Sequence, residues 1–125
     1  MKRVVITGLG AITPLGNSVN EFWAHILAGK SAAGPITKFD ASKFKTRFAC
    51  EVKNFDPAQF IDKKEVRRLD RFAQFAMVSS TEAILDAGLD KEGINKDRIG
   101  VIWASGIGGL DVFIEEITNL ALNPI

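Results

Sequence analysis

Cysteine and histidine each occur only once in this 125-residue chain, as Cys50 and His25. A single cysteine excludes an internal disulfide framework and any multi-cysteine metal site, and a single histidine leaves no hydrolase-like dyad or metal cluster to assemble. No histidine or helix start lies beside Cys50 in the sequence to activate its thiol, so we interpret it as a small buried side chain. His25 falls on the polar side of a predicted helix and is expected to be exposed or to cap it. We therefore predict no metal site and no catalytic residue within the chain.

A strong charge of one sign and a long hydrophobic run are also missing. The chain has sixteen basic and fifteen acidic residues, a net charge of +1. This charge creates no strong positive field that would favour nucleic acid as a partner. The apolar run Val4–Ile6 is cut by Thr7 and Gly8 and is too short for a signal peptide. No stretch approaches the roughly 18 apolar residues of a membrane span. These features, with the single cysteine, predict one cytoplasmic domain that neither spans a membrane nor binds nucleic acid.

Two glycine-rich turns, at residues 8–10 and 105–109, lack the signatures of nucleotide binding. The first has Thr13 where a dinucleotide fingerprint needs its third glycine, and neither turn carries the lysine and spacing of a phosphate-binding loop. We therefore expect no nucleotide cofactor, and no cofactor of another kind. The glycines are interpreted as permitting tight strand-to-helix turns.

Hydrophobic patterning predicts an alternating order of strands and helices. Strands are expected at residues 4–7, 48–52 and 98–104, and helices at residues 17–28, 63–87 and 110–122. Gly29 and Gly88 supply helix stops, residues 30–47 form a long connection, and Asp56-Pro57 opens a brief helical turn. This order is typical of an α/β protein with a mostly parallel sheet and helices on its faces.

The predicted 63–87 helix has two contrasting faces. Its apolar stripe is rich in small residues, among them Ala73, Ala76, Ser80 and Ala83, which predicts close approach to a neighbouring segment. The opposite arc of roughly 140° at 100° per residue gathers the basic residues Lys63, Lys64, Arg67, Arg68 and Arg71. We interpret this arc as a docking site for an acidic partner. The alternative is a merely solvated helix face.

Four motifs in order along the chain resemble the β-ketoacyl-acyl-carrier-protein synthases, the condensing enzymes of fatty-acid synthesis. They are Val4-Val5-Ile6-Thr7-Gly8-Leu9-Gly10 with Pro14-Leu15-Gly16, Phe22-Trp23 with Leu27-Ala28-Gly29-Lys30-Ser31, Lys64-Glu65-Val66-Arg67-Arg68-Leu69-Asp70-Arg71-Phe72, and Arg98-Ile99-Gly100-Val101 through Ser105-Gly106-Ile107-Gly108-Gly109. Ile107 within the last motif favours the elongating, type II members. The resemblance implies a thiolase-like fold, of which residues 1–125 would form an incomplete amino-terminal domain, part of the first βαβαβαββ half.

The resemblance also implies an activity and two sites. Family members are homodimers that load an acyl group onto a cysteine and condense it with malonyl-carrier protein by decarboxylation. The catalytic cysteine and histidines of the family lie in regions that follow those matched here, so we expect the 125-residue chain alone to be inactive. By resemblance, Lys63, Lys64, Arg67 and Arg68 form the carrier-protein docking patch, and Ile107 lines the acyl-chain pocket. The alternative is a free-standing, non-catalytic module that binds an acidic carrier protein.

Overall fold

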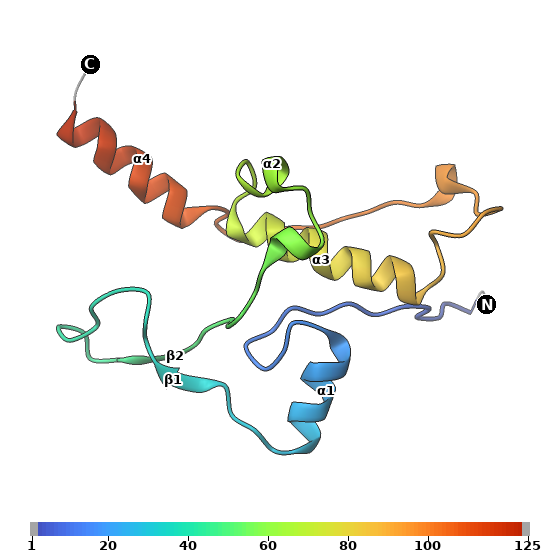
Figure 1. Cartoon of the computed structure of the whole chain (residues 1–125), viewed down its shortest axis with the longest axis horizontal. Helices are drawn as coiled ribbons and strands as arrows, with labels where there is room; N and C mark the ends of the chain where they lie inside the picture. Colours follow the sequence, from blue (N-terminus) through green and yellow to red (C-terminus); the bar gives the residue numbers. More distant parts are fainter. Residues whose placement is uncertain (1–2, 124–125) are drawn as a thin grey trace. The chain divides into compact units, whose positions relative to one another are not determined.

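The computed structural model describes residues 3–123, which fall into two compact units. Unit 1 is drawn from Met1–Asp56 and Ser79–Asp90, and unit 2 from Pro57–Val78 and Lys91–Ile125. Figure 1 shows helices, long irregular segments and one short pair of strands. Among the described residues, no helix combines the length and the apolar character needed to cross a membrane.

Unit 1 begins its regular structure with helix α1, Val19–Leu27. The hydroxyl of Ser18 caps this helix by accepting from the Glu21 N–H at 3.2 Å, and the Glu21 carboxylate accepts from the Asn17 N–H at 2.8 Å. Gly29, with φ +63°, follows the helix in the left-handed conformation that ends many helices. The predicted helix and its stop at Gly29 are therefore confirmed.

The only sheet in the described residues is an antiparallel pair, β1 (Ala33–Pro35) and β2 (Phe48–Cys50). Ala33 pairs with Cys50 and Pro35 with Phe48. The strand expected at 48–52 is present in shortened form, but its partner lies inside the predicted connection 30–47. The predicted parallel sheet is not formed by the described residues.

The predicted strands at residues 4–7 and 98–104 are wrong for this structure. Both segments are irregular and exposed over most of their length, and the Val4 and Ile102 side chains are 92% and 96% exposed. A strand needs a neighbour that takes up its N–H and C=O groups, and no described residue pairs with either segment. Their apolar residues are typical of buried strands, but no described segment forms backbone hydrogen bonds with them as a sheet neighbour.

Close approach to the second half of helix α3, Arg71–Asp86, is confirmed within unit 1. A Cβ atom added to Gly10 would lie 1.8 Å from the Ser79 backbone oxygen, and one added to Gly8 would lie 2.4 Å from the Ala83 backbone oxygen. Gly8 and Gly10 do not have positive φ. The interpretation of these two glycines as turn residues is therefore wrong, because they are needed for contact with a helix rather than for a turn.

Acidic side chains of α3 replace the missing sheet bonds of the amino-terminal segment. The Asp86 carboxylate accepts from the Leu9 N–H at 2.9 Å. The two oxygens of Glu82 accept from the Ala11 and Val19 N–H groups, each at 2.9 Å. One carboxylate thus holds both the end of the extended segment and the start of α1.

The helix predicted over residues 63–87 is interrupted. It is observed as α2, Lys63–Val66, and α3, Arg71–Asp86, with a turn at residues 67–70. Buried Gln74 explains the break, since its amide Nε2 donates to the Val66 and Leu69 carbonyl oxygens at 3.0 and 2.9 Å. This side chain satisfies carbonyl groups that a continuous helix would have bonded internally. Gly88, with φ +65°, follows α3 as predicted.

The other elements are short 3-10 turns and a final helix. The 3-10 helix η1, Pro57–Gln59, confirms the turn expected at Asp56-Pro57, and η2 covers Lys96–Arg98. Helix α4, Leu110–Leu122, confirms the last predicted helix.

The single cysteine and the single histidine differ from expectation. Cys50 is exposed rather than buried, because the two-stranded sheet leaves this side of β2 uncovered. His25 is half-buried, and its ring Nδ1 is hydrogen-bonded to the Leu15 carbonyl oxygen. His25 therefore links α1 to the turn before it and is not a free, exposed side chain on the polar side of the helix.

Candidate functional site

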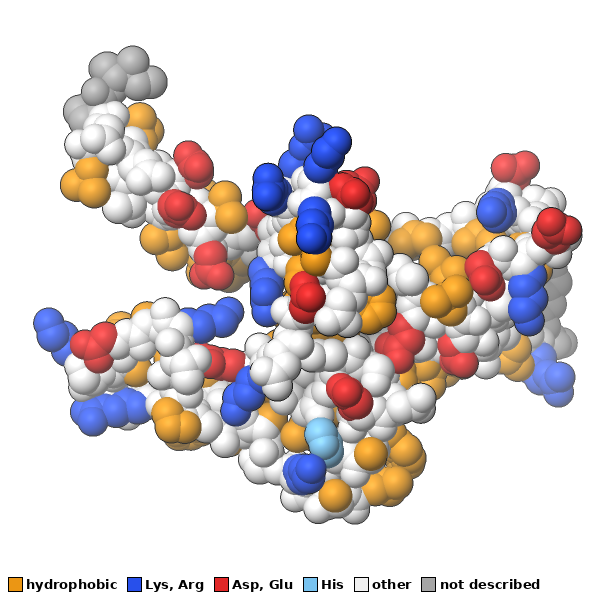
Figure 2. Space-filling model, in the orientation of Figure 1, with side chains coloured by type: hydrophobic (Ala, Val, Ile, Leu, Met, Phe, Trp, Pro, Cys, Tyr) orange, Lys and Arg blue, Asp and Glu red, His pale blue; other side chains and the backbone are white. Residues whose placement is uncertain are grey.

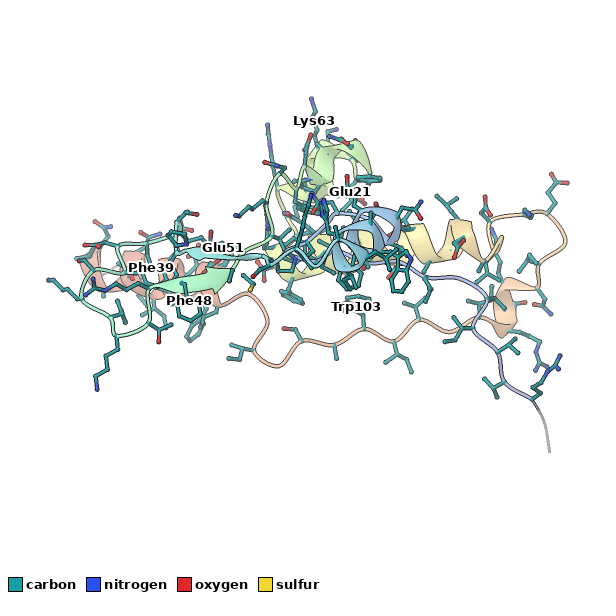
Figure 3. All side chains as sticks on the ribbon, turned by 90° about the horizontal axis from the view of Figure 1, so that it is seen from below. Glu21, Phe39, Phe48, Glu51, Lys63 and Trp103 are labelled. Carbon is teal, nitrogen blue, oxygen red and sulfur yellow. The ribbon has the colours of Figure 1, made fainter. Side chains whose placement is uncertain are left out.

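The basic residues predicted as a docking site surround α2 in unit 2. We define the basic surface as Lys63, Lys64, Arg67 and Arg68, all of which are exposed. Figure 2 shows Lys and Arg side chains gathered over α2, and Figure 3 shows Lys63 projecting outward from it. None of these four side chains makes an ion pair or hydrogen bond with another described residue. Their charged groups are available to a partner.

The interrupted helix changes the shape of this surface. Lys63 and Lys64 lie on α2, whereas Arg67 and Arg68 lie in the turn that follows it. The turn is closed by the Arg68 and Leu69 N–H groups, which donate to the Glu65 carbonyl oxygen at 2.9 and 3.0 Å. The prediction of one continuous basic helix face is therefore wrong. The surface is a short helix plus a turn, held in place from beneath by Gln74.

Arg71, the fifth basic residue of the predicted arc, is separated from the others by its position and its contacts. It is the first residue of α3, and its guanidinium carbon lies 5.2 Å from the centroid of the Phe75 ring. This distance is typical of a cation–π contact. We therefore leave Arg71 out of the basic surface.

Nearby acidic side chains only partly offset the positive charge. Asp62 caps α2, since its carboxylate accepts from the Lys64 N–H at 2.8 Å, and Glu65 is exposed on the same helix. Guanidinium groups can bind carboxylates or phosphates with two parallel hydrogen bonds, and ammonium groups act as point charges. The arrangement is suited to an anionic partner.

Ile107 stands in a turn of unit 2 that precedes α4. Its side chain is 79% exposed. The Gly108 N–H donates to the Ser105 hydroxyl at 3.1 Å, and Gly108 has φ +82°, a conformation that favours glycine. The structure therefore places Ile107 in a turn with a defined backbone, with most of its surface exposed.

The Ile107 turn lies against the segment that follows the basic surface. A Cβ added to Gly109 would lie 1.9 Å from the Asp70 Oδ2 atom, and one added to Gly108 would lie 3.8 Å from the Phe72 ring. Sequence reasoning missed the roles of Asp70, Gln74 and Gly109. Gln74 lies outside the predicted apolar stripe, on the side of the basic residues, so the helical pattern does not signal its burial.

Unit 1 contains a polar pocket of about 520 Å³ that no sequence prediction identified. It is lined by the turn before α1 and by residues that include His25, Lys30 and Lys53. The Asn17 amide donates to the Lys53 carbonyl oxygen at 2.9 Å, and its buried Oδ1 atom has no partner among the described residues. Within residues 3–123, no group of three or more His, Cys, Asp or Glu side chains is placed to hold a metal ion.

Comparison with known proteins identifies close relatives. Residues 1–123 match the family described as beta-ketoacyl synthase, N-terminal domain. The 3-oxoacyl-[acyl-carrier-protein] synthase 2 of Synechocystis sp. is 51% identical over 95% of this chain. The protein of the same name from Coxiella burnetii is 53% identical over 87% of it. The matched regions span only 29% and 26% of these two relatives.

Solved structures give the same answer for the fold. A beta-ketoacyl synthase from Burkholderia phymatum matches 97% of this chain and 30% of its own, with a TM-score of 0.75 and 31% identity. The ishigamide ketosynthase/chain length factor matches 94% of this chain and 30% of its own, with a TM-score of 0.72 and 32% identity. The fold is therefore that of part of a ketosynthase. With the family match over nearly its whole length, the chain belongs to the beta-ketoacyl synthase family, as its N-terminal domain.

Proposed function

We propose that this chain is the amino-terminal part of a 3-oxoacyl-[acyl-carrier-protein] synthase 2, an acyltransferase that elongates fatty acyl chains by decarboxylative condensation with malonyl-carrier protein. Support comes from relatives of that name that are 48–53% identical over most of the chain. The matched part is less than a third of each relative. We propose that the complete enzyme is a cytoplasmic homodimer with the thiolase-like parallel sheet, in which residues 4–7 and 98–104 become paired strands.

The exposed and unpaired basic surface is the observation that carries the functional proposal for this part of the enzyme. Lys63, Lys64, Arg67 and Arg68 would dock the acyl carrier protein, an acidic partner that delivers both substrates. Clustered positive charge raises the association rate of an oppositely charged protein and fixes its orientation. The turn geometry of Arg67 and Arg68 would present two guanidinium groups to carboxylates of the partner.

Ile107 is proposed to line the pocket that receives the acyl chain. A branched apolar side chain at the tip of a glycine-rich turn can move with little disturbance of the surrounding backbone. Its exposure in the described residues is consistent with a contact that the bound acyl chain or the rest of the enzyme supplies. The residue would then act on chain-length selectivity rather than on the chemical step.

We propose that no residue of this chain performs the chemistry. The acylated cysteine and the two histidines of the family would come from the part of the enzyme that follows, and this part of the chain would contribute docking and pocket surfaces. The alternative function, a free-standing module that binds an acidic carrier protein, predicts the same docking without condensation.

Charge reversal in the complete enzyme tests the docking proposal. Arg67→Glu with Arg68→Glu should weaken carrier-protein binding about tenfold or more, a change of roughly 1.4 kcal/mol per factor of ten. The affinity of the unmodified enzyme for the carrier protein should fall as the salt concentration rises, because the Debye length is only about 8 Å at physiological ionic strength. Titration calorimetry at two salt concentrations provides the measurement.

A matched control reverses two exposed basic residues of the same unit, Lys91→Glu with Lys96→Glu. This variant has the same net charge change and should bind the carrier protein nearly as well as the parent. Equal losses in both variants would mean that only net charge matters. Unchanged affinity in the Arg67 and Arg68 variant would mean that the basic surface is merely solvated and does not bind the carrier protein.

A further inference from the structure

The loop that joins β1 to β2 is rich in basic residues that the proposed enzyme function does not use. We define the hairpin loop as residues 36–47, which lie wholly within unit 1. It carries the exposed cations Lys38, Lys43, Lys45 and Arg47 and a single acidic residue, Asp40. Figure 2 shows Lys and Arg side chains spread around this loop with hydrophobic side chains among them.

Two phenylalanines of the hairpin loop, and a third at the start of β2, are also exposed. The rings of Phe39 and Phe44 contact each other edge to face, with centroids 5.5 Å apart and an interplanar angle of 70°. Phe39, Phe44 and Phe48 are 55%, 56% and 65% exposed. Figure 3 labels Phe39 on the loop and Phe48 on β2. More than half of each of these large apolar side chains is therefore uncovered.

The acidic groups near the loop are used to fold it. The Asp40 carboxylate accepts from the Ser42 N–H at 2.9 Å, and this hydrogen bond holds the pKa of Asp40 below its usual value. Glu51 accepts from the Thr37 hydroxyl at 2.6 Å and from the Thr37 N–H at 3.0 Å, and these bonds lower the pKa of Glu51. Lys38 interacts with Glu51 through its backbone N–H and its charge, whereas Lys43 and Lys45 make no ion pair or hydrogen bond with another described residue. The free charge on the loop is positive.

We propose that the hairpin loop is a contact site for an anionic lipid surface. Phenylalanines interleaved with lysines suit a bilayer interface, where rings enter the boundary between headgroups and acyl chains while ammonium groups stay with the phosphates. Clusters of four or more Lys and Arg are attracted to anionic headgroups. Protein interfaces, by contrast, are enriched in Arg and depleted in Lys, and three of the four cations here are lysines. Such a contact needs no membrane-spanning segment and does not depend on the proposed enzyme activity.

Vesicle binding by the complete polypeptide tests this proposal. The parent should co-sediment with phosphatidylcholine vesicles that contain phosphatidylglycerol and not with vesicles of phosphatidylcholine alone. Lys43→Gln with Lys45→Gln should weaken this binding about tenfold or more. Lys91→Gln with Lys96→Gln removes the same charge from exposed sites outside the hairpin loop and should leave binding near that of the parent. Equal losses in the two double variants would overturn the proposal.

A fluorescent substitution tests the position of the rings. Phe44→Trp should show a blue shift in emission on addition of the anionic vesicles, and brominated lipids should quench this added fluorescence relative to the parent. An emission that does not respond to vesicles, whether because the ring is covered in the complete polypeptide or because no lipid binds, would overturn the proposal. Tighter binding to polyglutamate or to a single-stranded oligonucleotide than to anionic vesicles would also overturn it, in favour of an acidic protein or nucleic acid.

Discussion

Gly10 makes one of the closest approaches to α3 in unit 1. Because a Cβ at this position would lie 1.8 Å from the Ser79 backbone oxygen, Gly10→Ala should force the amino-terminal segment away from α3. We expect the free energy of unfolding of the complete enzyme to fall by about 1–3 kcal/mol, the usual cost of overpacking. Urea denaturation measures this. Gly34→Ala is the matched control in the same unit, since the nearest atom to its added Cβ is the Lys53 Nζ at 3.8 Å, and a similar loss in the control would contradict the contact.

Glu51 provides a titration with a defined sign. Its two hydrogen bonds from Thr37 lower the pKa of the folded carboxyl from the ordinary value of 4.5. A lowered folded pKa means that the stabilisation is present above pH 4.5 and is lost as the pH falls through the folded pKa. The Thr37 amide proton shift in NMR should therefore titrate with a midpoint below 4.5, and this step should vanish in Glu51→Gln. A midpoint at or above 4.5 would mean that the hydrogen bonds are absent in solution.

At the scale of elements, Gln74 determines where α2 ends. Its buried amide donates to two carbonyl oxygens beneath the basic surface. Gln74→Met keeps the size of the side chain but leaves both carbonyls without this donor, which should cost about 1–3 kcal/mol of unfolding free energy and weaken carrier-protein binding. Gln74→Glu cannot donate when ionised and should behave similarly. Full stability and affinity in both variants would show that the break does not depend on this side chain.

Local signals predicted several elements correctly. Helix α1 has a side-chain cap at Ser18 and a glycine stop, and α4 has a continuous apolar pattern, so both follow from nearby residues alone. The break between α2 and α3 could not be predicted in the same way, because it depends on where the Gln74 amide points. The strands expected at 4–7 and 98–104 failed for a different reason, since pairing is non-local and their apolar pattern says nothing about which neighbour is present.

For the candidate sites, the sequence predicts which residues take part but does not predict how they are arranged. The spacing of the basic residues predicts one charged face only if residues 63–87 form a single straight helix, and the structure has two helices there. The resemblance singled out Ile107, and the structure adds that its turn abuts Asp70 and Phe72. The predicted turn role of Gly8 and Gly10 is wrong, because the sequence does not show which backbone segment passes over α3.

At the scale of the whole molecule, the exposed apolar surface is consistent with a part of a larger enzyme. Ile61 and Val78 are the buried hydrophobic residues among those described. Val4, Val5 and Ile6 of unit 1 are exposed, as are Val101, Ile102 and Trp103 of unit 2 and much of α4. Apolar patches of this kind mark interaction surfaces. We interpret them as surfaces that the rest of the proposed enzyme covers.

We propose that this chain supplies docking and pocket surfaces to a condensing enzyme whose chemistry lies elsewhere in the polypeptide. The most direct test compares the 125-residue chain with the complete enzyme in one assay, formation of 3-oxoacyl product from acyl-carrier protein and malonyl-carrier protein. The complete enzyme should form product, Ile107→Phe should reduce turnover of long acyl chains more than short ones, and the 125-residue chain should form none. Product formation by the chain alone, or none by the complete enzyme, would contradict the account.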